Sequence, residues 1–405
     1  MSAAAHLQGM APHSMPFPDR SPQGRALRAL VAGHPGVIVD SPPGAGKSTM
    51  VAAAVGFLHR TTPARVGVAT FTNEQGTAIA ARIAQVLGPD ADGLPQVQVA
   101  SRNMVVPEGV AGPGARTGDN PVTVRTVASC KVNPPELDVL VFDEAYQITF
   151  ADFAQAADQA EQTLLVGDPG QIGPVIAFNT GAWAHLRRGP HMRAPEVLAT
   201  SDSVPRFSLD KTFRLGPDTA AAIAPLYPFA FTSARPVRHI DGLDGEIACV
   251  EVPERVDPYD LETMRTVADA ATSYIGRTLH GDDGTRPLQA QDVAIVVSRN
   301  AQASALEALL LERGYGPGVI TVGTADRLQG GQWHAVVAVD PTLSGAESEH
   351  ALSSGRLCVM TSRHMTHMTW VYDAAWEDVL DQAADQPDAA RSIAVRQALV
   401  AFPPR

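Results

Sequence analysis

Short apolar runs rich in β-branched residues alternate with helical patterns along most of this chain of 405 residues. A strand that is apolar on both faces must be covered on both faces, and a parallel sheet flanked by helices provides that environment. The runs predict strands at Val37–Asp40, Val66–Thr70, Val97–Ala100, Val139–Asp143, Thr163–Val166, Ile247–Val252, Val293–Ser298, Val319–Val322, Ala335–Asp340 and Met368–Tyr372. The intervening patterns predict helices at Ser48–Leu58, Glu74–Leu87, Thr219–Leu226, Leu261–Leu279 and Ala301–Arg313. The chain is therefore predicted to have an α/β fold with two parallel sheets, each of about five strands.

A stretch containing Pro and Arg around Gly189–Arg206 separates the two groups of strands. The predicted divisions are a flexible leader at 1–19, a first domain at 20–206, a second domain at 207–380 and a C-terminal helix at 381–405. The helical spacing of apolar residues in Asp388–Phe402 predicts that this helix packs on the second domain, and the helix is also a candidate for binding a protein partner. Gly88–Pro121 is long and rich in Gly and Pro, so it is either a functional loop or a disordered one.

Composition and net charge indicate which classes of protein this chain can belong to. The net charge is −12, and 45% of the residues are hydrophobic, which is typical of a globular protein without a basic coat. An acidic net charge still allows nucleic acid to bind in a local groove. No apolar run approaches the ~18 residues of a membrane span, and the first residues do not resemble a signal peptide, so we expect a cytoplasmic protein with no membrane contact. The three cysteines form no CxxC pair and predict neither a disulfide framework nor a zinc site.

A buried strand, a glycine-rich turn and a helix follow one another after Val37. The turn has the sequence SPPGAGKST, and glycines at such a position let backbone N–H groups converge on phosphates at a helix N-terminus. The chain has only three lysines, and Lys47 stands where it would bridge the β- and γ-phosphates of ATP, with the Ser48 hydroxyl on Mg²⁺. Ser41 replaces the first glycine of the usual pattern. The predicted nucleotide-binding residues of the turn are Gly44, Gly46, Lys47, Ser48 and Thr49.

Two later strands end in polar residues that suit the same chemistry. Val139–Asp143 is followed by Glu144, so Asp143 can hold Mg²⁺ while Glu144 orients and deprotonates the attacking water. Thr163–Val166 is followed by a turn that ends at Gln171, whose amide can sense the γ-phosphate.

The order of these motifs resembles that of superfamily 1 helicases, most closely the 5′→3′ (1B) branch related to the nonsense-mediated-decay RNA helicase. The resemblance spans Pro18–Tyr372 and implies two tandem RecA-like P-loop domains that use ATP and Mg²⁺ and bind single-stranded DNA or RNA. Gln23 resembles the glutamine with which the family reads adenine. The residues that match the family's strand contacts are Thr70, Thr72, Asn73, Thr126 and Thr324.

The second half of the chain supplies the remaining matches. Arg214 and Arg363 match the two arginines that reach the γ-phosphate. Gln329 and Gly330 match a motif that couples nucleic-acid binding to ATP. Three positions depart from the family pattern: Phe213 replaces the more usual Tyr, Gln332 replaces a Glu near the ribose, and Arg363 ends a Thr-Ser-Arg sequence where Thr-Arg is more usual.

The resemblance implies an ATP-dependent helicase or translocase on single-stranded nucleic acid. One alternative is an ATPase that remodels protein–nucleic-acid complexes without unwinding, since the insertions that many relatives carry are short or absent. A second is a P-loop kinase or switch, which would not need Gln171, Arg214, Gln329 or Arg363. The sequence leaves open whether the strand is DNA or RNA, and the polarity rests on the resemblance alone.

Overall fold

The computed structural model describes residues 15–176, 179–183, 185–254, 257–345, 349–386 and 388–402. The chain forms two compact units. The first comprises residues up to Ser41, Gly46–Pro169 and Gly173–Asp210; the second comprises Pro42–Ala45, Gly170–Ile172 and Lys211 onward. No helix of the described residues is long and apolar enough to cross a membrane.

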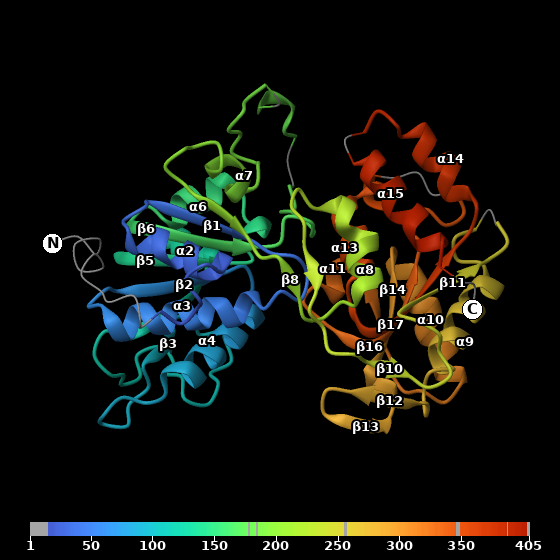
Figure 1. Ribbon diagram of the computed structural model, residues 1–405, viewed down its shortest axis with the longest axis horizontal. Coiled ribbons are helices and arrows are strands. Elements are labelled where there is room, and N and C mark those ends of the chain that lie inside the picture. Colours follow the sequence, from blue (N-terminus) through green and yellow to red (C-terminus); the bar gives the residue numbers. More distant parts are fainter. Residues whose placement is uncertain are drawn as a thin grey trace. The chain divides into compact units, whose positions relative to one another are not determined.

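The first unit is built on a seven-stranded sheet of order β3-β4-β2-β5-β6-β1-β7, in which every pairing is parallel. Its strands are β1 (Gly36–Asp40), β2 (Val66–Thr70), β3 (Val97–Val99), β4 (Val122–Thr126), β5 (Leu137–Asp143), β6 (Ala160–Gly167) and β7 (Arg206–Ser208). Its helices are α2 (Pro22–Val31), α3 (Lys47–Thr61), α4 (Asn73–Leu87), α5 (Val127–Val132), α6 (Phe150–Ala156) and α7 (Ala194–Leu198). Figure 1 shows α3 and α4 along one face of this sheet and α6 and α7 on the other.

The apolar residues of the first sheet explain this double covering. Ile38, Leu140 and Phe142 pack with Phe153 of α6 in one core cluster. The strand neighbours of Ile38 are also fully buried, and because side chains alternate along a strand they face the opposite side. A strand buried on both faces needs helices on both faces, as the sequence predicted.

The second unit is built on a five-stranded parallel sheet of order β11-β17-β16-β14-β15. Its strands are β11 (Ile247–Glu251), β14 (Val293–Val297), β15 (Thr321–Thr324), β16 (Trp333–Val339) and β17 (His364–Tyr372). Its helices are α8 (Pro217–Ile223), α9 (Leu261–Thr272), α10 (Asn300–Glu312), α11 (Ala325–Leu328), α12 (Glu349–Leu352), α13 (Ser354–Thr361), α14 (Ala375–Gln382) and α15 (Ala389–Val400). Two small sheets complete the unit. The parallel pair is β8 (Lys211–Thr212) with β9 (Thr232–Ser233), and the antiparallel sheet has β10 (His239–Ile240), β12 (Thr278–Gly281) and β13 (Gly284–Pro287).

Alternation along β14 divides the second unit into two core layers. Ala294 and Val296 pack in a cluster that contains residues of α8, α13 and α15. Val293, Ile295 and Val297 pack in a second cluster, with residues of α9 and α10. The predicted fold class is confirmed: an α/β fold with two tandem RecA-like domains built on parallel sheets.

Some predicted boundaries were wrong. The helix predicted at Leu261–Leu279 ends at Thr272, and Leu279 belongs to strand β12 instead. Gly276, with a φ of 85°, lies in the turn between helix and strand, a conformation that favours glycine. The strand predicted at Val319–Val322 lies at Thr321–Thr324.

The first sheet has seven strands rather than about five, because two short strands join it. β4 carries polar residues on one face, and β7 is only three residues long, so neither gave a continuous apolar run. The loop predicted over Gly88–Pro121 contains β3, which is held by hydrogen bonds to Ala111. Most of the predicted leader, residues 1–14, lies outside the described residues.

The C-terminal helix α15 packs on the second unit. Val395 and Leu399 are fully buried in the same cluster as residues of α8 and α13. Arg396, only 1% exposed, donates to both carboxylate oxygens of Asp340, at 2.8 and 2.9 Å. The helix is thus fixed by both apolar burial and an internal ion pair.

Candidate nucleotide-binding site

The phosphate loop follows β1 and leads into α3. Gly44 and Gly46 have φ values of 73° and 82°, the left-handed region that favours glycine. A Cβ on Gly46 would meet no atom within 4 Å, so there is open room at the N-terminus of α3. Backbone N–H groups in the first turn of a helix have no intrahelical partner, and an anion fits such a position.

Ser41 shows why its departure from the usual pattern is harmless. Its N–H donates to the Gly167 carbonyl at 2.9 Å, and its backbone does not adopt a positive φ. The side chain is fully buried, with its hydroxyl 3.3 Å from the same carbonyl. This position therefore needs no glycine.

Lys47 and Glu144 come together although 97 positions separate them in the sequence (144 − 47). The Lys47 Nζ lies 3.5 Å from Glu144 Oε1, and both side chains are largely buried. Glu144 has a φ of 56°, an uncommon left-handed conformation for a residue with a side chain. Such strain is frequent at functional sites. Glu144 therefore reaches Lys47 because it directly follows the end of β5.

Asp143 ends β5 and is 6% exposed. Burial, and next the negative charge of Glu144, raise the pKa of Asp143 to about 7, against the opposing effect of Lys47. A buried carboxylate that is costly to ionise becomes a favourable ligand when a divalent cation supplies the opposite charge. Mg²⁺ prefers oxygen ligands, so the donor set of Asp143 and the Ser48 hydroxyl in the first turn of α3 fits it. The Thr49 hydroxyl accepts from Arg82 of α4 at 2.8 Å, a contact that sequence reasoning missed.

Gln23 lies in the first turn of α2, directly after Pro22, and is half-buried. It belongs to the first unit, as do Lys47, Asp143 and Glu144.

Pro42–Ala45 belongs to the second unit because it is hydrogen-bonded to the chain around Thr212. The Thr212 hydroxyl donates to the Pro43 carbonyl at 2.6 Å, and the Phe213 N–H donates to the Gly44 carbonyl at 2.9 Å. A Cβ on Gly44 would lie 2.3 Å from Arg214 Cβ. Arg214 therefore starts beside the phosphate loop, and only glycine fits at position 44.

The Arg214 side chain is held by two partners that sequence reasoning did not assign to it. Its Nε donates to Gln332 Oε1 at 3.1 Å, and its Nη1 donates to the Ser362 carbonyl at 3.3 Å. Gln332 is the residue that replaces the family's Glu, and its amide oxygen here orients an arginine. No spacing in the sequence signals this contact, because the two residues are 118 positions apart.

Arg363 lies inside the second unit rather than on its surface. It is 1% exposed, and it donates to the carbonyls of Val359 and Gly331 and to the Ser362 hydroxyl, at 3.2, 3.4 and 2.9 Å. A guanidinium that reaches a phosphate must exchange at least some of these bonds.

Gln171 and Gln329 also meet within the second unit. The Gln329 amide donates to Gln171 Oε1 at 3.4 Å, at the C-terminal end of α11. Gly330 follows with a φ of 91°, which fixes the turn after this helix. A Cβ on Gly355 would lie 2.9 Å from the Gln171 carbonyl, so the glycine permits the close approach of this segment.

The predicted strand contacts of the first unit share one edge of its sheet. Thr70 ends β2 and Thr126 ends β4, and the two are register partners. Thr72 and Thr126 cap α4 and α5, accepting from backbone N–H groups at 3.2 Å each. Asn73 Oδ1 is buried without a hydrogen-bond partner, and Phe71, which sequence reasoning missed, is 49% exposed.

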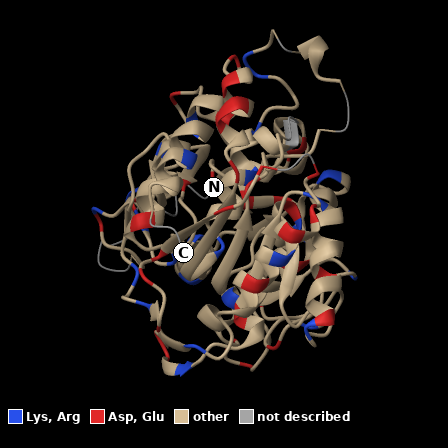
Figure 2. Ribbon diagram, turned by 90° about the vertical axis from the view of Figure 1, so that its right-hand side faces the viewer, with Lys and Arg blue, Asp and Glu red and all other residues tan. Residues whose placement is uncertain are grey.

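Thr324 is placed in the same way in the second unit. It ends β15 and caps α11. All three capping threonines therefore stand at the carboxyl end of a parallel strand, where helix N-termini can receive phosphate groups. Lys, Arg, Asp and Glu residues are interspersed along the ribbon in Figure 2.

Comparison with known proteins supports the nucleotide site. Residues 20–198 match the family model of an AAA domain. No curated protein matches the chain. The match covers less than half of the chain; together with the loop geometry and the Lys47–Glu144 pair it supports a nucleotide-binding site in the first unit.

Three solved helicase structures resemble 86% of this chain at low identity. The PRRSV helicase is 16% identical, with a TM-score of 0.45, over 86% of this chain and 54% of that chain. Arterivirus nonstructural protein 10 (helicase) in complex with DNA is 16% identical, with a TM-score of 0.49, over 86% and 65%. The same viral helicase in another crystal structure is 16% identical, with a TM-score of 0.47, over 86% and 62%. The chain thus spans 54% to 65% of the lengths of these helicases.

Proposed function

We propose that this protein is an ATP-dependent helicase or translocase on single-stranded nucleic acid, of the superfamily 1 type and resembling its 5′→3′ (1B) branch. The observation that carries the proposal is that one parallel sheet presents both sets of groups at its carboxyl edge. The phosphate loop follows β1, while Thr70 and Thr126 end β2 and β4. A change at the nucleotide can therefore reach the strand-contacting threonines through a single rigid sheet.

In the proposed ATP site, Gly44, Gly46 and the first turn of α3 hold the phosphates, with Lys47 on the β- and γ-phosphates and Thr49 beside it. Gln23 contacts the adenine. Mg²⁺, held by Ser48 and Asp143, would neutralise charge on the phosphates. The γ-phosphate would compete with Glu144 for Lys47, because Glu144 and Lys47 form an ion pair. Glu144, released from Lys47, would then act as the general base for water.

The second domain would complete the reaction. Arg214 and Arg363 would stabilise the negative charge on the γ-phosphate, and such arginines contribute about 10³–10⁵ in rate. Gln171 would sense the γ-phosphate and relay its loss to Gln329 and Gly330, and from there to Thr324. Hydrolysis in a cleft between the two RecA-like domains would then move the strand contacts of one domain relative to those of the other.

Nucleic-acid stimulation of ATP hydrolysis tests this function. Purified full-length protein is assayed with matched single-stranded DNA and RNA, beside a strand-displacement assay with the preferred strand. We expect stimulated hydrolysis and strand displacement, both weakened by salt because the contacts are to phosphates. Stimulation without displacement would instead support a remodelling ATPase. If neither strand stimulates hydrolysis, the helicase proposal is wrong and a P-loop kinase or switch gains support.

Asn73→Ala separates strand contact from nucleotide chemistry. The buried Asn73 Oδ1 has no hydrogen-bond partner among the described residues, so we expect the variant to lose stimulation while its unstimulated hydrolysis stays at the wild-type rate. Arg102→Ala, at an exposed position in the same unit, is the matched control and should keep both rates. Equal stimulation of Asn73→Ala and the control would remove Asn73 from the proposed strand contacts.

A further inference from the structure

A small antiparallel sheet in the second unit brings two histidines and an aspartate together. His239 of β10 is the register partner of His280 of β12, and the next pair, Ile240 and Leu279, is buried in the core beside α9 and α10. Because side chains alternate along a strand, burying that pair turns both histidines to the opposite, solvent-facing side. Asp241, two positions after His239, falls on the same side as the histidines.

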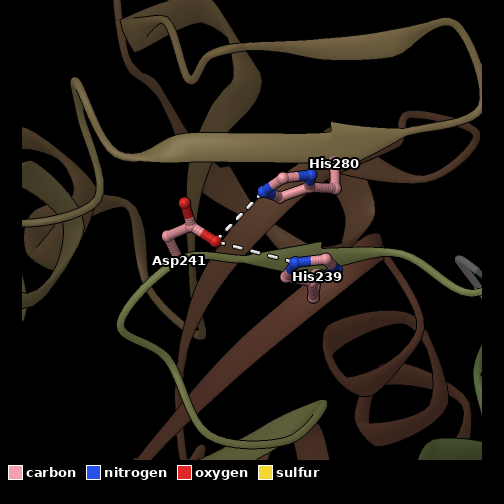
Figure 3. Close-up of side chains that lie close together, drawn as sticks. All are labelled: His239, Asp241 and His280. Atoms are coloured by element: carbon pink, nitrogen blue, oxygen red, sulfur yellow. Dashed lines mark hydrogen bonds and ion pairs between the residues drawn. The ribbon is translucent and has the colours of Figure 1, made fainter.

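The three side chains converge on one point, as Figure 3 shows. Asp241 Oδ1 lies 3.0 Å from His280 Nε2 and 3.6 Å from His239 Nε2. One ligand atom from each of the three residues lies within 4.8 Å of the others. The imidazole rings are stacked, with centroids 4.0 Å apart and planes inclined by 9°.

We infer that His239, Asp241 and His280 form a binding site for a divalent transition-metal ion, with Zn²⁺ as the ion that best suits it. Zn²⁺ binds imidazole nitrogen and carboxylate oxygen at about 2.0–2.2 Å, so ligand atoms around a tetrahedral ion lie roughly 3.3 Å apart. The separations of 3.0 and 3.6 Å bracket that value. Because the two imidazole planes are nearly parallel, the rings would have to tilt for both Nε2 lone pairs to point at one ion, and the exposed side of the sheet allows this movement.

A further residue orients one ligand. The His280 Nδ1 lies 3.1 Å from the Thr285 hydroxyl, which follows on β13. A metal on Nε2 requires the proton on Nδ1, and the Thr285 oxygen can accept it, as outer partners of metal-bound histidines usually do. Thr285 is thus a positioning residue for the proposed site.

The neighbouring arginines Arg238 and Arg277 bind other groups and not the Asp241 carboxylate. Arg238 pairs with Asp282, and Arg277 donates to the backbone carbonyls of Asp241 and Gly242, at 3.2 and 2.9 Å. The side chains of His239 and Asp241 are each 55% exposed, which leaves room for water or for a ligand atom from a partner on the metal. The site would be an open one that ties β10 to the β12–β13 hairpin, and it shares no residue with the nucleotide site.

The spacing of the ligands explains why no sequence pattern indicated this site. His239 and His280 are 41 positions apart (280 − 239), and only the strand register makes them neighbours. The cysteines, which guided the expectation that there would be no zinc site, take no part in it.

Zinc binding to untagged, metal-free full-length protein tests the inference, measured by titration calorimetry and by the visible spectrum of Co²⁺ as a substitute ion. We expect one saturable site whose affinity falls at least about tenfold in His280→Ala and in Asp241→Asn, and about tenfold in Thr285→Val. His185→Gln, at an exposed histidine of the first unit, is the matched control and should bind as the wild type does.

Two results would overturn the proposal. One is wild-type protein that shows no saturable binding of either ion. The other is binding of equal affinity in His280→Ala and in the His185→Gln control, which would place the ion elsewhere. Circular dichroism of His280→Ala, expected to match the wild type because the residue is on the solvent face, separates lost binding from lost folding. Wild-type affinity and an unchanged Co²⁺ spectrum in Thr285→Val would remove only its positioning role.

Discussion

Breaking the buried Arg396–Asp340 ion pair should strongly destabilise the second unit. Both side chains are 1% exposed, and the guanidinium donates to both carboxylate oxygens. Removing one partner of a buried pair leaves an uncompensated charge, at a cost of about 3–5 kcal/mol. Asp340 keeps two hydrogen bonds from Thr342, from its N–H at 2.9 Å and its hydroxyl at 2.7 Å, so we expect the lower end of that range for Arg396→Met. For a unit of this size, about 3 kcal/mol corresponds to a fall in Tm of roughly 6–12 °C.

Replacing both partners should cost much less than replacing one. Arg396 Nη1 is buried without a hydrogen-bond partner, so the native pair is itself incompletely satisfied. In Arg396→Met/Asp340→Asn no buried charge remains, and the amide oxygen that replaces the carboxylate can still accept from Thr342. We therefore expect the double variant to lie within about 1 kcal/mol of the wild type. The difference between this value and the sum of the single variants measures the coupling.

Tryptophan fluorescence during thermal and urea unfolding is a suitable assay. Three of the four tryptophans, Trp333, Trp370 and Trp376, belong to the second unit, so the signal reports mainly on its unfolding. If Arg396→Met unfolds within about 1 kcal/mol of the wild type, α15 is not held by this pair. The helix would then be held by the burial of Val395 and Leu399 instead.

Five further substitutions test the nucleotide site and the core of the second unit. Lys47→Ala should abolish ATP binding, as checked by nucleotide fluorescence. Glu144→Gln should keep ATP binding but lower kcat about 10²–10⁴-fold, as checked by phosphate release. Normal turnover by Glu144→Gln would refute the role of Glu144 as a base. Gly44→Ala should reduce stability more than Gly46→Ala, because a Cβ would meet Arg214 at position 44 and open space at position 46. Equal urea midpoints of the two variants would contradict the close approach of Gly44 to Arg214. Glu246 is buried, which by itself raises its pKa, but hydrogen bonding and charge from His364, together with Arg235 and Thr219, lower it to about 2. Because the folded pKa lies below the ordinary 4.5, this carboxylate stabilises the fold above pH 4.5 and the contribution is lost as the pH falls toward about 2. Glu246→Gln should therefore be less stable at pH 7 by up to about 3 kcal/mol and show a flatter acid unfolding curve, and an unchanged curve would refute the assignment.

Features that depend on neighbouring residues could be predicted without a structure. Strand, turn and helix around Lys47 are consecutive, so the turn glycines and the helix start were visible without a structure. The apolar runs of β14 and β16 predicted strands that are buried on both faces. The alternating packing of their residues in two core layers confirms this prediction. These predictions succeed because backbone preference and hydrophobic period act over a few residues.

Contacts between side chains that are distant in the sequence result from the tertiary structure. It placed Glu144 beside Lys47, Gln171 beside Gln329, and His280 beside His239. It also buried Arg363, an arginine that the sequence matched to a γ-phosphate contact without indicating its burial. Strand order and register set these pairings, and both result from packing the entire sheet rather than from any local signal. The phosphate loop could be found in nine consecutive residues, but the groups around it required the fold.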